Sequence, residues 1–214
     1  ISNENEIETT FGTPVKAEHN DIIINEVLFN PITPGVDYLE IYNRSNKVID
    51  LSKLLIGTIK ESFPNPPDTI AKEICSHSRI ILPNSYILLS SDNDIVIEQY
   101  LNTESQLPIS RSQIFIEMVS FPSFSNDEGK IFICNKSREI IDEVYYSDKM
   151  HYDLLVETKG VSLERISFDN PSLDKTNWHS ASYNVNYGTP GYINSVAVND
   201  IKTTEYEEIC IIPE

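Results

Sequence analysis

The 214-residue sequence lacks any run of about eighteen apolar residues, which a transmembrane helix would need. Its most apolar stretches, residues 22–29 and 79–90, are short and interrupted by polar residues or proline. The first residues also lack the basic and apolar regions of a signal peptide, so if the parent protein is exported we expect its signal upstream. The sequence therefore predicts no transmembrane segment.

Cysteine is scarce and widely spaced. Cys75, Cys134 and Cys210 form no C-x-x-C pair, so neither a disulfide scaffold nor a zinc knuckle is indicated. The simplest interpretation of Cys75 and Cys134 is that they are small buried hydrophobic side chains. A disulfide between these two stays open, because each follows an apolar stretch that could lie in a facing sheet.

Basic residues are few relative to acidic ones. The chain has 16 Lys and Arg against 33 Asp and Glu, which gives a formal net charge of −17. No Lys/Arg cluster supplies a local basic patch, so we expect no nucleic-acid partner. The excess of acids suits solubility at a crowded surface and leaves carboxylates for a hard cation such as calcium.

Recognisable catalytic motifs are absent as well. There is no G-x-S-x-G, no H-E-x-x-H and no glycine-rich phosphate loop, and glycine itself is limited to seven residues. The histidines stand singly among polar neighbours, and no spacing selects a catalytic triad. We therefore predict that the chain is not an enzyme and has no catalytic residues.

What the sequence does contain is a series of short strand patterns. A β-branched run begins after Asp21 and ends at the turn residues 30–35, and in residues 37–43 Leu39 and Ile41 alternate with polar positions toward the core. In residues 79–90 a Pro-Asn-Ser turn separates two apolar runs, which predicts a β-hairpin or a sharp corner. The proline-rich residues 63–67 are expected to form a loop.

One helix and one clear hairpin complete the pattern. Ser91 followed by Asp94 resembles a capping box, and the spacing of Val96 and Tyr100 fits about two helical turns. Residues 130–134 and 139–146 flank a tight turn and predict a hairpin. Together these features predict an all-β fold, an antiparallel β-sandwich with one short helix, in which Trp178 belongs to the core.

Eight sequence blocks, in this order, resemble the signature blocks of bacterial lamin-tail domains. They are Ile24–Pro31, Asp37–Asn43 with Ile49–Leu51, Leu82–Tyr86, Asn126–Gly129, Ile141–Asp142, Gly160–Arg165, Asn177–Trp178 with Ser180–Ser182, and Gly188–Asn194. The resemblance covers about residues 21–195. It implies an immunoglobulin-like accessory module of large exported bacterial proteins, for which no catalytic residues are assigned.

The resemblance also suggests a domain organisation. We expect an N-terminal linker at residues 1–20, a lamin-tail-like β-sandwich domain at 21–195, and at 196–214 a C-terminal linker toward a further domain. It implies an extracellular or cell-surface location in a bacterium. The partners it suggests are a protein or a cell-surface polysaccharide, for a monomeric module within a multidomain chain.

Carboxylates are the strongest candidates for chemistry. If the strand with Glu26 pairs with the strand with Glu40, these two and Asp37 at the loop end could coordinate a structural Ca²⁺. The simpler interpretation is that these acids, with Asp127 and Glu128, accept hydrogen bonds from loop backbone or from arginine side chains. No other cofactor is expected.

Two further patterns concern pairs of neighbouring residues. Glu164 and Arg165 follow Leu163 on an expected strand, so one of the two should face outward. Several tyrosines lie where a strand face could be exposed, which suits either cross-strand packing or a binding surface for peptide or polysaccharide; they are Tyr38, Tyr42, Tyr145 and Tyr146.

Three functions are consistent with these observations. The first is a non-catalytic accessory or structural module of a larger exported cell-surface protein, for spacing, adhesion or protein interaction. The second is a carbohydrate- or calcium-binding accessory domain of a secreted hydrolase or nuclease. The third, a metal-dependent phosphodiesterase using Glu26, Asp37 and Glu40, requires those carboxylates to lie close together.

Overall fold

The structure is a computed structural model that describes residues 13–62, 65–101 and 114–198. Its α-helix is α1 (Asn93–Tyr100). Its strands are β1 (Ile22–Leu28), β2 (Tyr38–Asn43), β3 (Ile49–Asp50), β4 (Leu54–Ser62), β5 (Asn65–Glu73), β6 (Ile80–Ile81), β7 (Tyr86–Ser90), β8 (Phe115–Glu117), β9 (Glu128–Asn135), β10 (Ile140–Ser147), β11 (Leu163–Arg165) and β12 (Trp178–Ser180).

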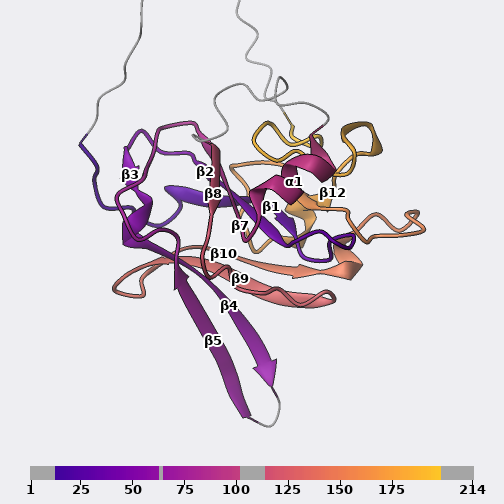
Figure 1. Ribbon diagram of the computed structural model, residues 1–214, viewed down its shortest axis with the longest axis horizontal. Coiled ribbons are helices and arrows are strands. Elements are labelled where there is room, and N and C mark those ends of the chain that lie inside the picture. Colours follow the sequence, from indigo (N-terminus) through magenta and orange to yellow (C-terminus); the bar gives the residue numbers. More distant parts are fainter. Residues whose placement is uncertain (1–12, 63–64, 102–113, 199–214) are drawn as a thin grey trace, which may run out of the picture.

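The strands form two main sheets in a sandwich (Figure 1). One sheet has six strands in the order β12-β11-β1-β2-β7-β8, and the other has four in the order β10-β9-β4-β5. This confirms the predicted all-β sandwich with one short helix, although β7 and β8 pair in parallel. Within the described ranges no helix is long and apolar enough to cross a bilayer.

Apolar side chains from both sheets fill the space between them. Ile24 of β1, together with Leu39 and Ile41 of β2, meets Ile56 of β4 in one buried cluster. Leu39 and Ile41 have no exposed surface, which confirms the predicted alternation, and Trp178 joins the same cluster. Burial of a large aliphatic side chain stabilises a fold by roughly 1.5–3 kcal/mol, so this cluster is the main source of stability.

The outer face of the six-stranded sheet is covered too. Leu28, Tyr38 and Leu88 pack there with Val96 and Tyr100 of α1 in a second buried cluster. The cap of α1 differs from the predicted one, because the carboxylate of Asp92, and not Ser91, accepts the backbone N–H of Ile95 at 3.1 Å. The six-stranded sheet is therefore buried on both faces.

A β-bulge in β1 decides which of its residues face outward. Ile24 pairs with Ile41 and Glu26 pairs with Glu40, so Asn25 is the extra residue. Because side chains alternate along a strand, this insertion moves the even-numbered positions from the inner face at Ile24 to the outer face at Glu26. The bulge therefore places Glu26 on the same face as Glu40.

The structure decides between the two forms predicted for residues 79–90, and it differs from the prediction for residues 63–67. The Pro-Asn-Ser turn is a corner, because β6 pairs with β3 while β7 belongs to the six-stranded sheet. Pro66 and Pro67, expected in a loop, lie in β5, the end strand of its sheet, where a missing N–H is tolerated. The β4–β5 hairpin extends well away from the body (Figure 1). The hairpin of β9 and β10 is confirmed.

The ends of the expected domain and its cysteines also have clear positions. Val15 bridges to Ile49 of β3, and Ala17 is buried in the main core, so the packed body includes residues before 21. Cys75 and Cys134 are both free thiols, and no bridge joins them. Cys210 lies outside the described residues.

A buried ion pair links the two sheets. Arg165 of β11 and Asp142 of β10 are almost fully buried, and their side chains approach to 3.4 Å. The carboxylate of Asp142 accepts the N–H of Ile24 at 2.7 Å, and Nε of Arg165 donates to the carbonyl of Ile24 at 2.7 Å. Since β11 pairs with β1 only at Glu26 and Val27, the ion pair satisfies the backbone where the neighbouring strand has ended.

Two further side chains hold this ion pair in place. Ser172 donates its hydroxyl to Asp142 at 2.5 Å, and the guanidinium carbon of Arg165 lies 4.9 Å from the centre of the Trp178 ring. The indole N–H of Trp178 in turn donates to the carbonyl of Ser172 at 2.9 Å. Trp178 is thus both part of the core and one wall of the arginine's site.

Removal of the negative partner should therefore be costly. We expect Asp142→Asn to lower the free energy of unfolding by about 3–5 kcal/mol, because the Arg165 guanidinium would stay buried without a counter-charge. Urea denaturation followed by circular dichroism measures this loss. The exposed pair of Lys136 and Glu73 is the control, and Glu73→Gln should leave the midpoint nearly unchanged. Equal effects of the two substitutions would contradict this role of the ion pair.

Candidate functional site

A row of three buried glutamates crosses the six-stranded sheet. Glu26 on β1 pairs with Glu164 on β11 and with Glu40 on β2, so the three residues are direct neighbours on adjacent strands. All three side chains point to the outer face, and their exposed fraction is 0%. We call Glu26, Glu40 and Glu164 the glutamate row.

Glu26, the central member, accepts hydrogen bonds from several sides. Its Oε1 accepts the hydroxyl protons of Tyr38 at 2.6 Å and Ser162 at 2.5 Å, and the backbone N–H of Thr189 at 3.0 Å. Ser162 precedes β11 and Tyr38 begins β2, so the flanking strands supply two of these donors. The carboxyl group is therefore fixed in one orientation.

The other two glutamates bind the segment near the end of the described chain. Oε2 of Glu40 accepts the N–H of Gly191 at 2.5 Å. Oε2 of Glu164 accepts the hydroxyl of Ser195 at 2.7 Å and the N–H of Val196 at 3.1 Å. Residues 189–196, which we call the C-terminal segment, are thereby held on the outer face by all three carboxylates.

A tight turn brings the C-terminal segment to these carboxylates. Gly191 has a φ of +96°, a conformation that side-chain-bearing residues rarely adopt. Pro190 precedes it, and the N–H of Tyr192 donates to the carbonyl of Thr189 at 3.2 Å, as in a type II turn. Asn194 then donates to the carbonyls of Asn25 at 3.1 Å and Arg165 at 2.8 Å, so the segment also satisfies the bulge.

No cation neutralises the glutamate row. Among the described residues no Lys or Arg side chain bonds to any of its carboxylates. Burial, with the nearby charge of Glu164, raises the pKa of Glu26 from 4.5 to about 7. Burial also raises the pKa of Glu40 well above 4.5 and raises that of Glu164. The row therefore holds protons at pH values where surface glutamates are ionised.

The hydroxyl of Thr189 lies between two members of the glutamate row. Its oxygen is 2.7 Å from Oε1 of Glu164 and 3.3 Å from Oε2 of Glu26. A hydroxyl has one proton to donate, so Thr189 donates to only one of the two carboxyl groups at a time. The raised pKa of Glu26 lessens the charge repulsion between the two groups, because it favours the neutral form of Glu26.

The structure gathers two of the three carboxylates expected to bind calcium. Glu26 and Glu40 are neighbours, but the carboxylate of Asp37 accepts the backbone N–H of Phe124 at 3.0 Å. Residue 37 is an odd position like Leu39, so its side chain lies on the opposite side of β2 from Glu40. No group of three or more His, Cys, Asp or Glu side chains in the described ranges is arranged to hold a metal ion, and calcium binding stays a prediction.

Glu164 is the member of the row that sequence reasoning missed. We expected either Glu164 or Arg165 to face solvent, yet both are buried, on opposite faces of β11. The strand alternation was readable, but the C-terminal segment that covers Glu164 was not. Alternation therefore located the two faces of the strand without showing that both are covered.

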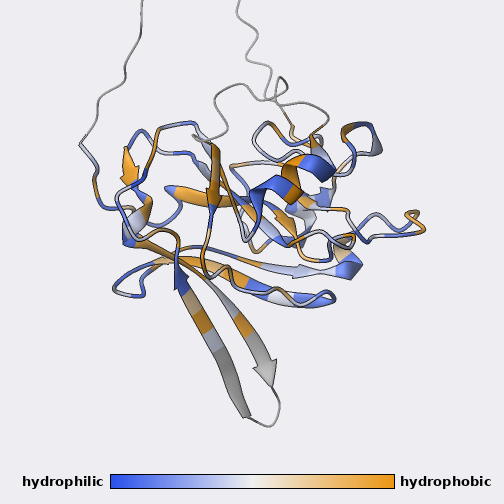
Figure 2. Ribbon diagram, viewed as in Figure 1, coloured by the Kyte–Doolittle hydropathy of each residue, from blue (hydrophilic) through white to orange (hydrophobic). Residues whose placement is uncertain are grey.

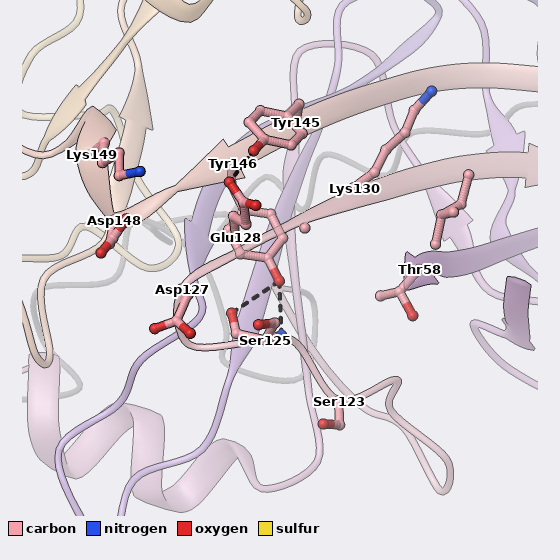
Figure 3. A pocket seen from close by; sticks show the side chains of 12 residues that line it. Thr58, Ser123, Ser125, Asp127, Glu128, Lys130, Tyr145, Tyr146, Asp148 and Lys149 are labelled. Carbon is pink, nitrogen blue, oxygen red and sulfur yellow. Dashed lines mark hydrogen bonds between the residues drawn. The ribbon is translucent and has the colours of Figure 1, made fainter. Parts of the chain in front are cut away.

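Asp127 and Glu128 belong to a separate, open groove of about 1000 Å³ at the ends of β9 and β10 (Figure 3). The hydroxyl of Tyr145 donates to Glu128, and Nζ of Lys175 lies 4.5 Å from the centre of the Tyr145 ring. Tyr146 accepts the N–H of Ser125 at 2.8 Å and donates to its carbonyl at 3.1 Å. The groove therefore presents carboxylates and an aromatic edge in a fixed arrangement.

The expected tyrosine rows are mainly packing pairs. The Tyr38 ring meets Tyr100 edge-on at 5.6 Å between centroids, and Tyr42 lies 4.7 Å from Tyr86 and 4.3 Å from Phe168. The contact of Tyr42 with Tyr86 is cross-strand packing between β2 and β7, whereas Tyr100 belongs to α1 and Phe168 to a loop. In the groove of Figure 3, Tyr145 and Tyr146 are instead joined to the polar groups described above.

Comparison with known proteins gives no family assignment. A scan against protein-family models finds no match to this chain, and a search of the curated proteins finds no relative.

The proton on Glu26 makes stability depend on pH. A carboxyl whose pKa rises from 4.5 to about 7 on folding stabilises the fold below pH 4.5, and this stabilisation is lost as pH rises through about 7. Glu26→Gln, which keeps the shape of the side chain and cannot ionise, should therefore melt near the wild-type temperature at about pH 5 and above it at about pH 8. Circular dichroism melts at the two pH values measure this difference.

The exposed helical variant Glu98→Gln is the matched control for loss of one carboxylate. Its difference from wild type should not reproduce the change of the Glu26 variant between the two pH values. If Glu26→Gln differs from wild type by the same amount at both pH values, Glu26 holds no proton in the folded chain.

Proposed function

We propose that this chain is a non-catalytic accessory or structural module of a larger exported bacterial cell-surface protein, serving spacing, adhesion or protein interaction. The observation that carries the proposal is the burial of the glutamate row. A general acid, a general base or a nucleophile must come within hydrogen-bond reach of its substrate. Glu26, Glu40 and Glu164 have no exposed surface, and each already binds the C-terminal segment.

The other buried charges support the same function. Asp142 and Arg165 are occupied by each other and by the backbone of Ile24. Together with the glutamate row, they account for most of the buried Asp, Glu and Arg side chains among the described residues, and all of them form structural hydrogen bonds. A rigid sandwich of this kind suits a spacer or an interaction module better than an enzyme.

The resemblance to lamin-tail domains agrees with this proposal at particular residues. The resembling blocks contain Glu26, Glu40 and Glu164, and the last block contains Thr189 and Gly191, to which these glutamates bind. The resemblance therefore includes residues that hold the C-terminal segment on the six-stranded sheet. An accessory role in an exported multidomain protein, and with it an extracellular or cell-surface location, follows as a proposal.

A hydrolase assay tests the non-catalytic function. We expect the chain to hydrolyse chromogenic glycosides, phosphodiesters and esters no faster than an Asp127→Asn/Glu128→Gln variant does. This variant is the informative comparison because Asp127 and Glu128 line the open groove, where a substrate could reach them. Both proteins should show the same slope of absorbance against time as a heat-denatured sample. Turnover by the wild-type chain that disappears in the double variant would overturn the proposal.

A second function, carbohydrate or calcium binding as an accessory domain of a secreted hydrolase or nuclease, is favoured by the groove in Figure 3. Its carboxylates, Asp127, Glu128 and Asp148, lie beside Tyr145, an arrangement of polar groups and an aromatic ring that suits a sugar. Calcium titration and a glycan array measure this directly. If this function holds, calcium raises the melting temperature or a glycan binds, and Glu128→Gln weakens the effect; a chain that responds to neither lacks this function.

A further inference from the structure

One loop presents an apolar tip to solvent. Leu154 is 75% exposed and Val156 is 104% exposed, and Tyr152 nearby is 49% exposed. In Figure 2 the tip of this loop is coloured as hydrophobic, and it extends beyond the rest of the molecule. Adjacent exposed aliphatic side chains on a projecting loop indicate a contact surface, because single exposed residues are normal but clusters are not. We call residues 154–156 the knob.

The base of this loop is firmly attached at both ends. The N–H of Tyr152 donates to the hydroxyl of Ser180 at 2.9 Å, and the N–H of Gly160 donates to the carbonyl of Asn30 at 2.7 Å. Gly160 has a φ of +80°, and a Cβ added there would lie 2.5 Å from Cγ1 of Ile32. The knob therefore projects from a fixed base, which lowers the entropy that a contact would cost.

A recess of about 280 Å³ lies beside β3, on the other side of the molecule from the knob in Figure 1. Its walls are mostly aliphatic and include Val15, Ala17, Ile49 and Leu54. The recess exists because residues 14–17 bridge to β3 and leave Val15 half-exposed at the rim. We call it the socket. A space of this size admits one or two aliphatic side chains.

The charges around the knob and the socket are complementary. Asp153 and Glu157 directly flank the knob, with Lys159 two residues further along the loop, whereas Lys16 and Lys53 lie at the socket. Lys16 pairs with Glu139 at the surface, but within the described residues Lys53 makes no ion pair. The third charge at the socket, Asp50, is bound to Ser52, Ser78 and the N–H of Arg79. The socket thus offers an available lysine to an acidic knob.

We propose that the knob of one copy of this chain inserts into the socket of a second copy, in a head-to-tail contact. Both surfaces belong to the same chain and lie on different sides of it, so each copy can bind one neighbour through its knob and another through its socket. Such a contact does not close on itself and produces linear rows of copies. This assignment of a partner rests on the proposed role as an interaction module.

A lipid surface is a less suitable partner for the same knob. Asp153 and Glu157 flank its apolar residues, and the chain has a net charge of −17. Anionic lipids would repel both, whereas loops that bind such membranes usually carry basic flanks. Apolar burial in a socket with Lys53 nearby satisfies the aliphatic tip and its acidic flanks at once.

The contact is small, and this sets its strength. Stable interfaces bury about 1,200–2,000 Å² in total, which is more than a loop tip in a recess can provide. The net charge of −17 on each copy adds long-range repulsion, which salt screens. We therefore expect a monomer in dilute solution, as the sequence predicts, and linear association when copies are concentrated or held together on a surface.

Nuclear magnetic resonance of the whole chain tests the contact. Raising the concentration from about 0.05 to about 1 mM should shift the amide signals of residues 152–157 and of residues 14–17 and 49–54, and these two groups only. Leu154→Ser/Val156→Ser removes the knob, and Val15→Glu/Lys53→Glu blocks the socket. Each variant alone should lose the concentration dependence, because all four side chains are at the surface and their loss should preserve the fold.

Mixing the two variants gives the decisive result. Isotope-labelled knob variant, titrated with unlabelled socket variant, should shift only at its intact socket, and the reverse labelling should shift only at the intact knob. The mixture should stop at pairs, because the one intact knob and the one intact socket of each pair already bind each other. Val119→Ser, which removes a fully exposed aliphatic side chain elsewhere, is the control and should behave as wild type.

The outcomes separate the contact from the proposed function. No shifts up to about 1 mM, or shifts that persist in the knob variant, would overturn the contact between copies. Knob-dependent binding to phosphatidylcholine vesicles without self-association would overturn it in favour of a lipid surface. None of these results would alter the hydrolase assay, whose positive outcome alone overturns the non-catalytic role.

Discussion

The structure depends on how three buried glutamates on one sheet are satisfied. Glu164, Glu26 and Glu40 lie side by side across β11, β1 and β2 with no exposed surface. Isolated carboxylates in such a position would be very costly, so each must be protonated, hydrogen-bonded or both. The C-terminal segment supplies the backbone and hydroxyl donors, and the raised pKa of Glu26 favours the protonated form of its carboxyl group. The sheet and the segment therefore stabilise each other.

The buried ion pair serves the same strand as the glutamate row. The glutamate row on the outer face and the Arg165–Asp142 pair between the sheets are both used to complete hydrogen bonds around β1. β1 is short of strand neighbours near its bulge, and side chains replace them there. What remains for interaction is at the surface, in the groove beside Tyr145 and in the knob and socket on two sides of the molecule.

The sequence predicted the parts of the fold that depend on local pattern. Alternation identified the strand of Leu39 and Ile41, and the turn between two apolar runs identified the hairpin of β9 and β10. The pairing of the Glu26 and Glu40 strands entered only as a condition, which the structure meets. The sequence could not predict that β8 pairs in parallel with β7, because α1 and further residues separate the two strands in sequence and no local pattern encodes their pairing. Prolines in residues 63–67 suggested a loop, but an edge strand tolerates Pro66 and Pro67.

The candidate site was only partly readable for the same reason. The positions of Glu26 and Glu40 on two expected strands suggested that they could meet. Asp37 lies on the opposite side of β2 from Glu40, where its carboxylate binds the backbone of Phe124, and this contact depends on how β2 packs in the fold. Glu164 joins the row through the β1–β11 register, which no local signal encodes. The knob and socket depend on which aliphatic residues remain uncovered after folding, and composition does not contain that information.

The central claim, that the glutamate row holds the C-terminal segment as part of the folded core, is tested most directly by native-state hydrogen exchange. The amides of Thr189, Gly191 and Val196 donate to Glu26, Glu40 and Glu164 respectively. If the segment is part of the core, these three amides exchange only through global unfolding, with the same free energy as the amides of β1 and β2. Exchange of the three amides through local opening, while β1 and β2 stay protected, would contradict this claim.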